Sequence, residues 1–285
     1  MEHPTVALLK TTFADFQRHK SQWLAAAIAY FTLFATAPLI IVVVEIAGLF
    51  LGQHRAALGR LYAYMSVTAG QAATPVIKAI VAATFSQPRN NMLAQIIAWI
   101  VFVVAAVGLF SSLQDALNTV WDVAPGARTL AQTARERLVS FAAVLAMALL
   151  LLVALAVNAG LTIASAALLH VVPGFPTIAK TLDLAATFAM TTLLFAVLFV
   201  LLPDCRVAWR DVWLGAFVSA GLFVAGQFVL GWYLGRVAIT SAYGTFGGLI
   251  AFLIWTYYSA QILLIGAEFT HVYAQRYGSL KLPND

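Results

Sequence analysis

Two carboxylates, Glu45 and Glu268, fall within long apolar stretches of this 285-residue sequence. A charged side chain is costly inside a membrane, so a carboxylate there needs either a partner or a function. Glu45 could bind a proton or a cation in an outward-facing cavity. Alternatively, it could reach the outer interface or pair with Lys180 or Arg236.

Glu268 belongs to a polar stripe on the last apolar stretch, whose members recur at helical spacing: Tyr257, Gln261, Glu268 and His271. It could face the same cavity as Glu45, but an ion pair with an inner-side arginine is slightly favoured (Arg206, Arg210 or Arg276). Gln261 and Asn158 complete the candidate cavity or coupling residues. For these two amides, hydrogen bonding between helices is the simpler interpretation.

A second stripe closes another apolar stretch, where Ser111, Asp115, Asn118 and Asp122 follow at i, i+4, i+7 and i+11 with Gln114 beside them. Such a stripe could line an inner vestibule built on Gln114, Asp115 and Asn118. It could equally be the solvated face of a helix that leaves the membrane.

Metal and redox chemistry have little support in the sequence. Cys205 is the single cysteine, and the five histidines are spread without metal-ligand spacing. No phosphate-binding loop is present, so an ATP motor is not expected. We therefore expect no metal, no cofactor and no enzymatic activity, and no nucleic-acid partner.

The composition explains why these few polar residues stand out. Charged residues make up 9% of the chain and hydrophobic residues 62%, whereas about 25% charge is usual for a soluble domain. Six apolar stretches are long enough to cross a membrane, which predicts an all-α, polytopic membrane protein. They are Leu24–Leu51, Met92–Leu113, Leu138–Leu169, Leu182–Leu202, Val212–Leu234 and Leu249–Val272.

The distribution of basic residues predicts the topology. With the N-terminus inside, ten Lys and Arg fall on the inner side and six on the outer side. The positive-inside rule therefore favours both termini inside. This organisation gives residues 23–275 as a six-helix transmembrane domain and residues 276–285 as a cytoplasmic tail, with a helical outer loop at residues 52–91. That loop could act as a lid over a cavity, but a packing element is the simpler interpretation.

Residues 1–22 are expected to form an amphipathic helix on the inner leaflet. Val6, Leu9, Phe13 and Phe16 recur at i, i+3, i+7 and i+10, with Lys10, Arg18 and Lys20 nearby. A soluble helix that caps the protein is the alternative.

Small residues and one proline predict where helices approach or bend. Pro38 should kink the first membrane helix, because it removes a backbone donor. Pairs four residues apart, such as Gly215 with Ser219 and Gly221 with Ala225, predict close packing of the last two helices. The same roles, packing or a hinge, are expected for Gly231, Gly235, Gly244, Gly247 and Gly248.

Several of these stretches together resemble the YihY/BrkB family of bacterial inner-membrane proteins. They are residues 25–34 with Ala37-Pro38-Leu39, residues 113–118 with Trp121-Asp122-Val123, and residues 243–248 with 255–260 and 266–268. Leu202-Pro203-Asp204 and Trp209-Arg210 also fit. The resemblance covers about residues 23–273 and implies a six-helix protein of the bacterial inner membrane. Some members of the family have carried a ribonuclease label, for which this sequence offers no catalytic or RNA-binding residues.

Two functions are compatible with these observations. The first is transport or flipping of a lipid or amphiphile in the cell envelope without an ATP motor; the resemblance contributes the lipid association. The alternative is a non-transporting scaffold for envelope machinery. Membrane lipids are the expected partners, and the sequence leaves the oligomeric state open.

Overall fold

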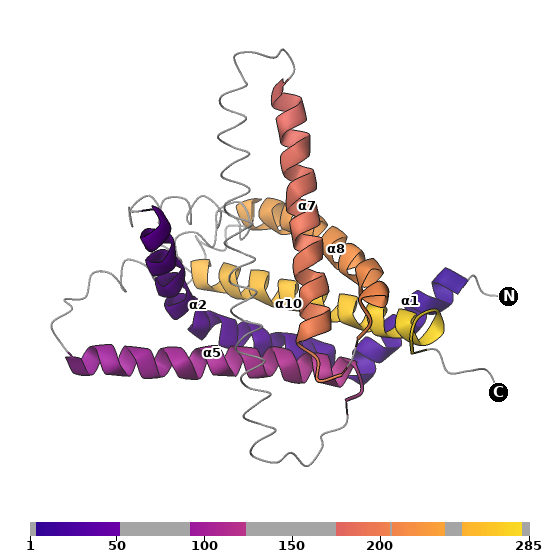
Figure 1. Cartoon of the computed structure of the whole chain (residues 1–285), viewed down its shortest axis with the longest axis horizontal. Helices are drawn as coiled ribbons and strands as arrows, with labels where there is room; N and C mark the ends of the chain where they lie inside the picture. Colours follow the sequence, from indigo (N-terminus) through magenta and orange to yellow (C-terminus); the bar gives the residue numbers. More distant parts are fainter. Residues whose placement is uncertain (1–3, 52–91, 124–174, 206, 237–246, 281–285) are drawn as a thin grey trace. The chain divides into compact units, whose positions relative to one another are not determined.

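A computed structural model describes residues 4–51, 92–123, 175–205, 207–236 and 247–280. Within these ranges the chain is helical, without a β-strand (Figure 1). The helices are α1 (Pro4–Arg18), α2 (Ser21–Leu51), α5 (Met92–Val120), α7 (Phe175–Leu201), α8 (Trp209–Arg236) and α10 (Gly247–Arg276). The all-α class expected from the sequence is confirmed for this part of the chain.

Among the described residues, three helices contain spans long and apolar enough to cross a membrane: Leu184–Leu201, Trp209–Leu230 and Gly247–Arg276. Helices also occupy two further predicted segments, as α2 and α5. The segment predicted at Leu138–Leu169 and the outer loop at 52–91 lie outside the described residues. The six-span count and the inside location of both termini therefore stay predictions.

Helix bounds differ from the predicted apolar stretches mainly at polar ends. α5 continues seven residues beyond Leu113 to Val120, and α7 begins seven residues before Leu182. Hydropathy marks only the apolar part of a helix, whereas the backbone hydrogen bonds continue into the polar turns. α2 runs through Pro38 without interruption and changes direction partway along its length (Figure 1).

The chain divides into two compact units. Unit 1 comprises Met1–His19, Leu117–Leu222 and Leu263–Asp285, and unit 2 comprises Lys20–Ala116 and Phe223–Ile262. The division falls within α5, α8 and α10, so each of these helices contributes one part to each unit.

Unit 1 is held together by a close contact between α8 and α10. A Cβ placed on Gly215 would collide with the side chain of Thr270, and one placed on Gly266 would collide with Ser219. Each helix thus offers a small residue followed four positions later by a hydroxyl. Both hydroxyls donate to their own helices, Ser219 to Gly215 O at 2.8 Å and Thr270 to Gly266 O at 2.7 Å. The packing that the Gly215 and Ser219 spacing predicts is confirmed.

Unit 2 uses aromatic rings against glycines. Phe31 of α2 covers Gly108 of α5, and Tyr258 of α10 covers Gly226 of α8.

The pair of Gly221 and Ala225 does not behave as expected, because a Cβ on Gly221 would meet nothing within 4 Å. Spacing alone does not say which face of a helix is covered, and Gly221 lies on an open one.

Candidate functional site

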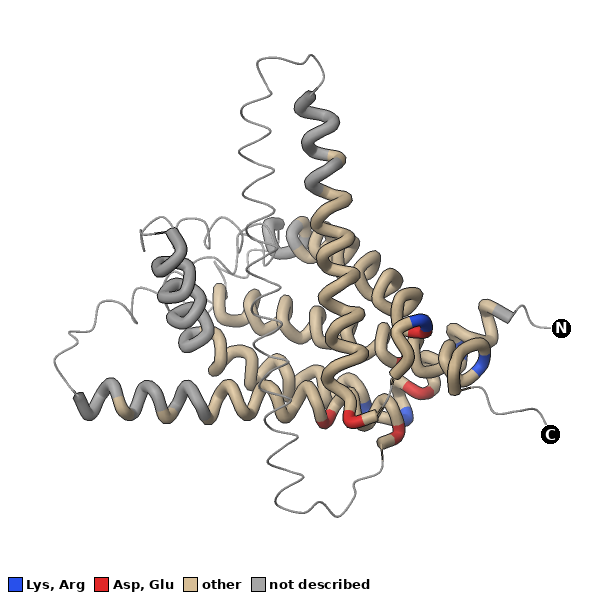
Figure 2. The backbone as a smooth tube through the Cα atoms, viewed as in Figure 1, with Lys and Arg blue, Asp and Glu red and all other residues tan. Residues whose placement is uncertain are grey.

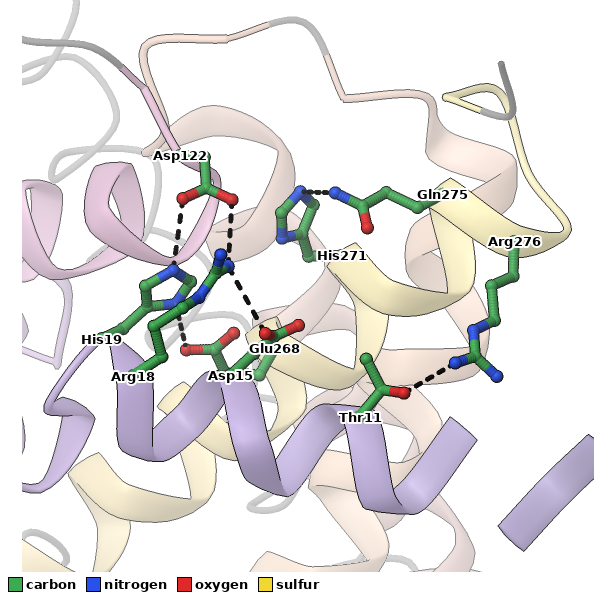
Figure 3. Close-up of polar contacts among 9 residues, drawn as sticks. All are labelled: Thr11, Asp15, Arg18, His19, Asp122, Glu268, His271, Gln275 and Arg276. Atoms are coloured by element: carbon green, nitrogen blue, oxygen red, sulfur yellow. Dashed lines mark hydrogen bonds and ion pairs between the residues drawn. The ribbon is translucent and has the colours of Figure 1, made fainter. Parts of the chain in front are cut away.

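A polar cluster lies where α1, the end of α5 and α10 meet in unit 1 (Figure 3). At its centre is the imidazole of His19, directly after α1. His19 Nδ1 lies 2.8 Å from Glu268 Oε1, and His19 Nε2 lies 3.2 Å from Asp122 Oδ1. Glu268 is fully buried, and the His19 side chain is 8% exposed.

The two contacts of His19 define what this site can do chemically. An ionised carboxylate only accepts hydrogen bonds, so when Glu268 and Asp122 are both ionised, each ring nitrogen must carry a proton. The imidazole is then a cation between two anions. The alternative is a protonated carboxyl group donating to a neutral ring. In either form a proton is shared at a buried site, as acid–base and proton-relay chemistry requires.

Arg18 extends the cluster toward the surface. Its Nη2 lies 3.3 Å from Asp122 Oδ2 and 3.4 Å from Asp15 Oδ1. The Arg18 and Asp122 side chains are each more than half exposed, so this pair contributes little to stability. The energetically important pair is therefore the buried one, His19 with Glu268.

Asp122 is held in position by the way α5 ends. Val123 N donates to Asn118 O at 2.9 Å and Asp122 N donates to Thr119 O at 3.2 Å, which is the hydrogen-bond pattern of a Schellman motif. The φ of Asp122 is 51°, the left-handed conformation usually taken by glycine. Asp and Asn tolerate this conformation better than other side chains, so Asp122 both ends the helix and presents a carboxylate to His19.

Two buried nitrogen atoms lie beside the ion pair. The Trp121 and His271 rings are 5.0 Å apart between centroids. Gln275 Nε2 lies 2.9 Å from His271 Nε2; since an amide NH₂ can only donate, the proton of a neutral His271 is on Nδ1. Neither His271 Nδ1 nor Trp121 Nε1 has a hydrogen-bond partner in the described ranges. An oxygen acceptor, such as that of a polar headgroup, would suit both.

Three further contacts join the same end of unit 1. Asn118 Nδ2 donates to Asp204 Oδ2 at 2.7 Å, and Asp204 N donates to Asn118 Oδ1 at 2.8 Å. Arg276 Nη2 donates to Thr11 Oγ1 at 2.6 Å. In the first turn of α8, Asp211 accepts from Ser279 N and Oγ at 2.8 and 2.6 Å. The charged residues drawn in Figure 2 thus include many that connect helix ends.

Cys205 is next to one of these contacts. Burial, and then the negative charge of Asp204, raise the pKa of its thiol above the ordinary value. The thiol is therefore protonated at neutral pH and is a weak nucleophile.

The structure describes the surroundings of two of the four candidate cavity residues, Glu268 and Gln261. Glu268 is buried and pairs with His19. Arg206, one of the three arginines considered as its partner, lies outside the described residues, so the expected ion pair with an arginine stays a prediction. Gln261 lies two turns earlier on α10 and is half-buried. The side chain of Glu45, in α2, and all of Asn158 lie outside the described part of the structure.

The residues of the polar stripe predicted to line an inner vestibule differ in their exposure. Ser111, Asp115 and Asp122 are exposed, whereas Gln114 and Asn118 are half-buried. Asn118 is occupied by its double contact with Asp204. Of the predicted packing or hinge glycines, Gly247 and Gly248 are buried in the first turn of α10. Gly244 lies outside the described residues, as do the surroundings of Gly231 and Gly235.

Sequence reasoning missed His19 and Asp204 as partners. His19 directly follows Arg18 at the end of an amphipathic pattern, 249 residues before Glu268. No local spacing connects positions so far apart. A signal for Asp204 was present, because Asn118 and Asp204 both belong to stretches that carry the family resemblance. The resemblance did not predict that the two residues pair.

Comparisons with known proteins agree on the class of this chain. The family model for the virulence factor BrkB matches residues 12–284. A UPF0761 membrane protein of Methylibium petroleiphilum is 31% identical over 93% of this chain and 61% of its own length. One from Pseudomonas paraeruginosa is 30% identical over 90% of this chain and 61% of its own. The chain thus spans about three fifths of these relatives. No solved structure matches.

Proposed function

Because the chain belongs to the BrkB family of membrane proteins, we propose that it moves a lipid or another amphiphile across the bacterial inner membrane without an ATP motor. The proposal includes no catalytic step. It goes beyond the names of the relatives, which say only that they are membrane proteins.

The observation that supports transport is the polar cluster buried under α1. Glu268 and His271 lie in α10, a helix with the length and composition of a membrane span, and both are at least 97% buried. Taking ionisable groups out of water in such a helix carries a large desolvation penalty, so ionisable residues there are candidates for a function. The proton shared by His19 and Glu268, with the two neighbouring N–H groups, could bind a polar headgroup and release it when the proton moves.

The test is lipid transport by purified protein in liposomes. Fluorescent phospholipids with different headgroups are added, and their movement is followed by dithionite quenching of the outer leaflet. We expect movement above that of protein-free liposomes, reduced at least tenfold by Glu268→Gln and by His271→Ala. Ser111→Ala is the matched control, because Ser111 is exposed. Liposomes in which the protein moves no lipid and no other amphiphile contradict the proposal.

A second candidate is a non-transporting scaffold for envelope machinery. The observation in its favour is that Asn118, Asp204 and Asp211 are all engaged in contacts between helix ends. A scaffold requires stable helices and no mobile proton. If the protein is a scaffold, the Glu268→Gln variant should restore the normal phenotype of a deletion strain, provided that it accumulates to the level of the unmodified protein. If the protein is a transporter, the same variant should fail to restore the phenotype at that protein level.

A further inference from the structure

Helix α1 has two apolar faces, and within the described part of the chain only one of them is covered. Leu8, Thr12 and Phe16, at i, i+4 and i+8, are buried. Leu8 packs with Phe269 and Val272 of α10 and with Val218 of α8. This face attaches α1 to unit 1, together with the Thr11 and His19 hydrogen bonds.

The second face consists of Val6, Leu9 and Phe13, which we call the outer stripe. These side chains are 44%, 60% and 63% exposed, although they recur at i, i+3 and i+7. Phe16 was expected on the same face, but it is 8% exposed and belongs to the attached face. A helix that only capped the protein would have polar residues at these positions, because water would cover them.

Contacts at the end of α10 place α1 beside the last turn of α10 and near the first turn of α8. Arg276, the last residue of α10, bonds Thr11 in the middle of α1. Ser279, three residues later, bonds Asp211 in the first turn of α8. That turn is flanked by Trp209 and Trp213, both almost half exposed. Exposed tryptophans at the end of an apolar helix are typical of the membrane–water interface.

We propose that α1 lies in the membrane interface with the outer stripe among lipid acyl chains. One face then rests on α8 and α10, the neighbouring face enters the lipid, and the remaining face is in water. Lys10 is exposed beside the stripe and reaches the phosphate level, where basic residues are favoured. The chain enters α2 after a turn at His19 and Lys20, and Trp23, 70% exposed, follows in the first turn of α2.

The experiment uses the full chain in lipid nanodiscs with a polarity-sensitive fluorophore on a single cysteine. Cys205→Ser removes the native thiol, and Leu9→Cys or Phe13→Cys supplies the labelling site. Ala14→Cys is the matched control, since Ala14 is also exposed but lies about 140° around the helix from Leu9. Spin-labelled lipids quench a fluorophore among acyl chains, and iodide quenches one in water.

We expect lipid quenching at Leu9 and Phe13 to exceed that at Ala14 at least threefold, with the opposite order for iodide. Equal iodide quenching at the three sites would place the stripe in water and overturn the proposal. Protection of Leu9 and Phe13 from both quenchers would also overturn it, because a protein surface would then cover the stripe. Two independent sites keep the test valid if one labelled variant does not fold.

Discussion

Replacing Glu268 should reveal the contribution of its buried pair with His19. In Glu268→Gln the shape of the side chain is kept, but the bond to His19 loses its charge. A hydrogen bond to a charged group contributes about 1.5–3 kcal/mol, against about 1 kcal/mol for a neutral one. Since Glu268 is fully buried and His19 is 8% exposed, water cannot replace the bond. We expect the free energy of unfolding to fall by the difference between the two, about 0.5–2 kcal/mol.

Asp122→Asn provides the comparison. It removes a charge from the other side of the same imidazole, but Asp122 is 52% exposed. Asn also tolerates the left-handed backbone conformation at this position. The expected loss is at most about 1 kcal/mol.

The assay is reversible unfolding of the full chain in mixed micelles with increasing sodium dodecyl sulfate, followed by the fluorescence of the seven tryptophans. A double-mutant cycle of Glu268→Gln with His19→Asn should give a coupling energy of about 1–3 kcal/mol. If the two effects add, or if Glu268→Gln costs no more than Asp122→Asn, the buried pair does not hold α1 to α10.

Three other outcomes are expected. Gly215→Ala should destabilise the chain by about 1–3 kcal/mol through overpacking against α10. Gly221→Ala, with open space around it, should be neutral or stabilise by up to about 1 kcal/mol. Thermal unfolding in detergent distinguishes the two variants, and equal effects would contradict the α8–α10 contact. Asn118→Ala removes both bonds to Asp204 and should cost about 1–3 kcal/mol, measured in the same way, while an unchanged transition would show that the bonds carry no stability. Because burial and Asp204 raise the pKa of the Cys205 thiol, its alkylation rate should keep increasing at pH values where the rate of a free cysteine has reached its plateau, and a plateau at the same pH as for a free cysteine would refute this.

The sequence predicts the helical class well, because long apolar stretches leave few alternatives to helices in a membrane. The contact around Gly215 also follows from it, since small residues four apart mark a close approach. The opposite result at Gly221 shows the limit of that rule. A spacing defines a face of a helix, and only the neighbouring helices decide whether that face is covered.

The candidate site was predicted only in part. Glu268 stands out because it is the only Asp or Glu in α10. Its partner His19 does not stand out, because no local sequence pattern marks it. His19 reaches Glu268 only when α1 packs against α10. The sequence also assigned Phe16 to the outer stripe, but tertiary packing turned it to the attached face. These decisions depend on contacts between distant positions, and periodicity does not contain them.

The contact between His19 and Glu268 also has a consequence for biosynthesis. α1 leaves the ribosome before α8 and α10, but the residues that pack on Leu8 are in those two helices. At about 5–20 residues per second, the 249 residues between His19 and Glu268 take about 12–50 s to translate. During this time Leu8 has no partner in α10, and a lipid surface is the nearest apolar environment. α1 is therefore made well before it can reach its final position.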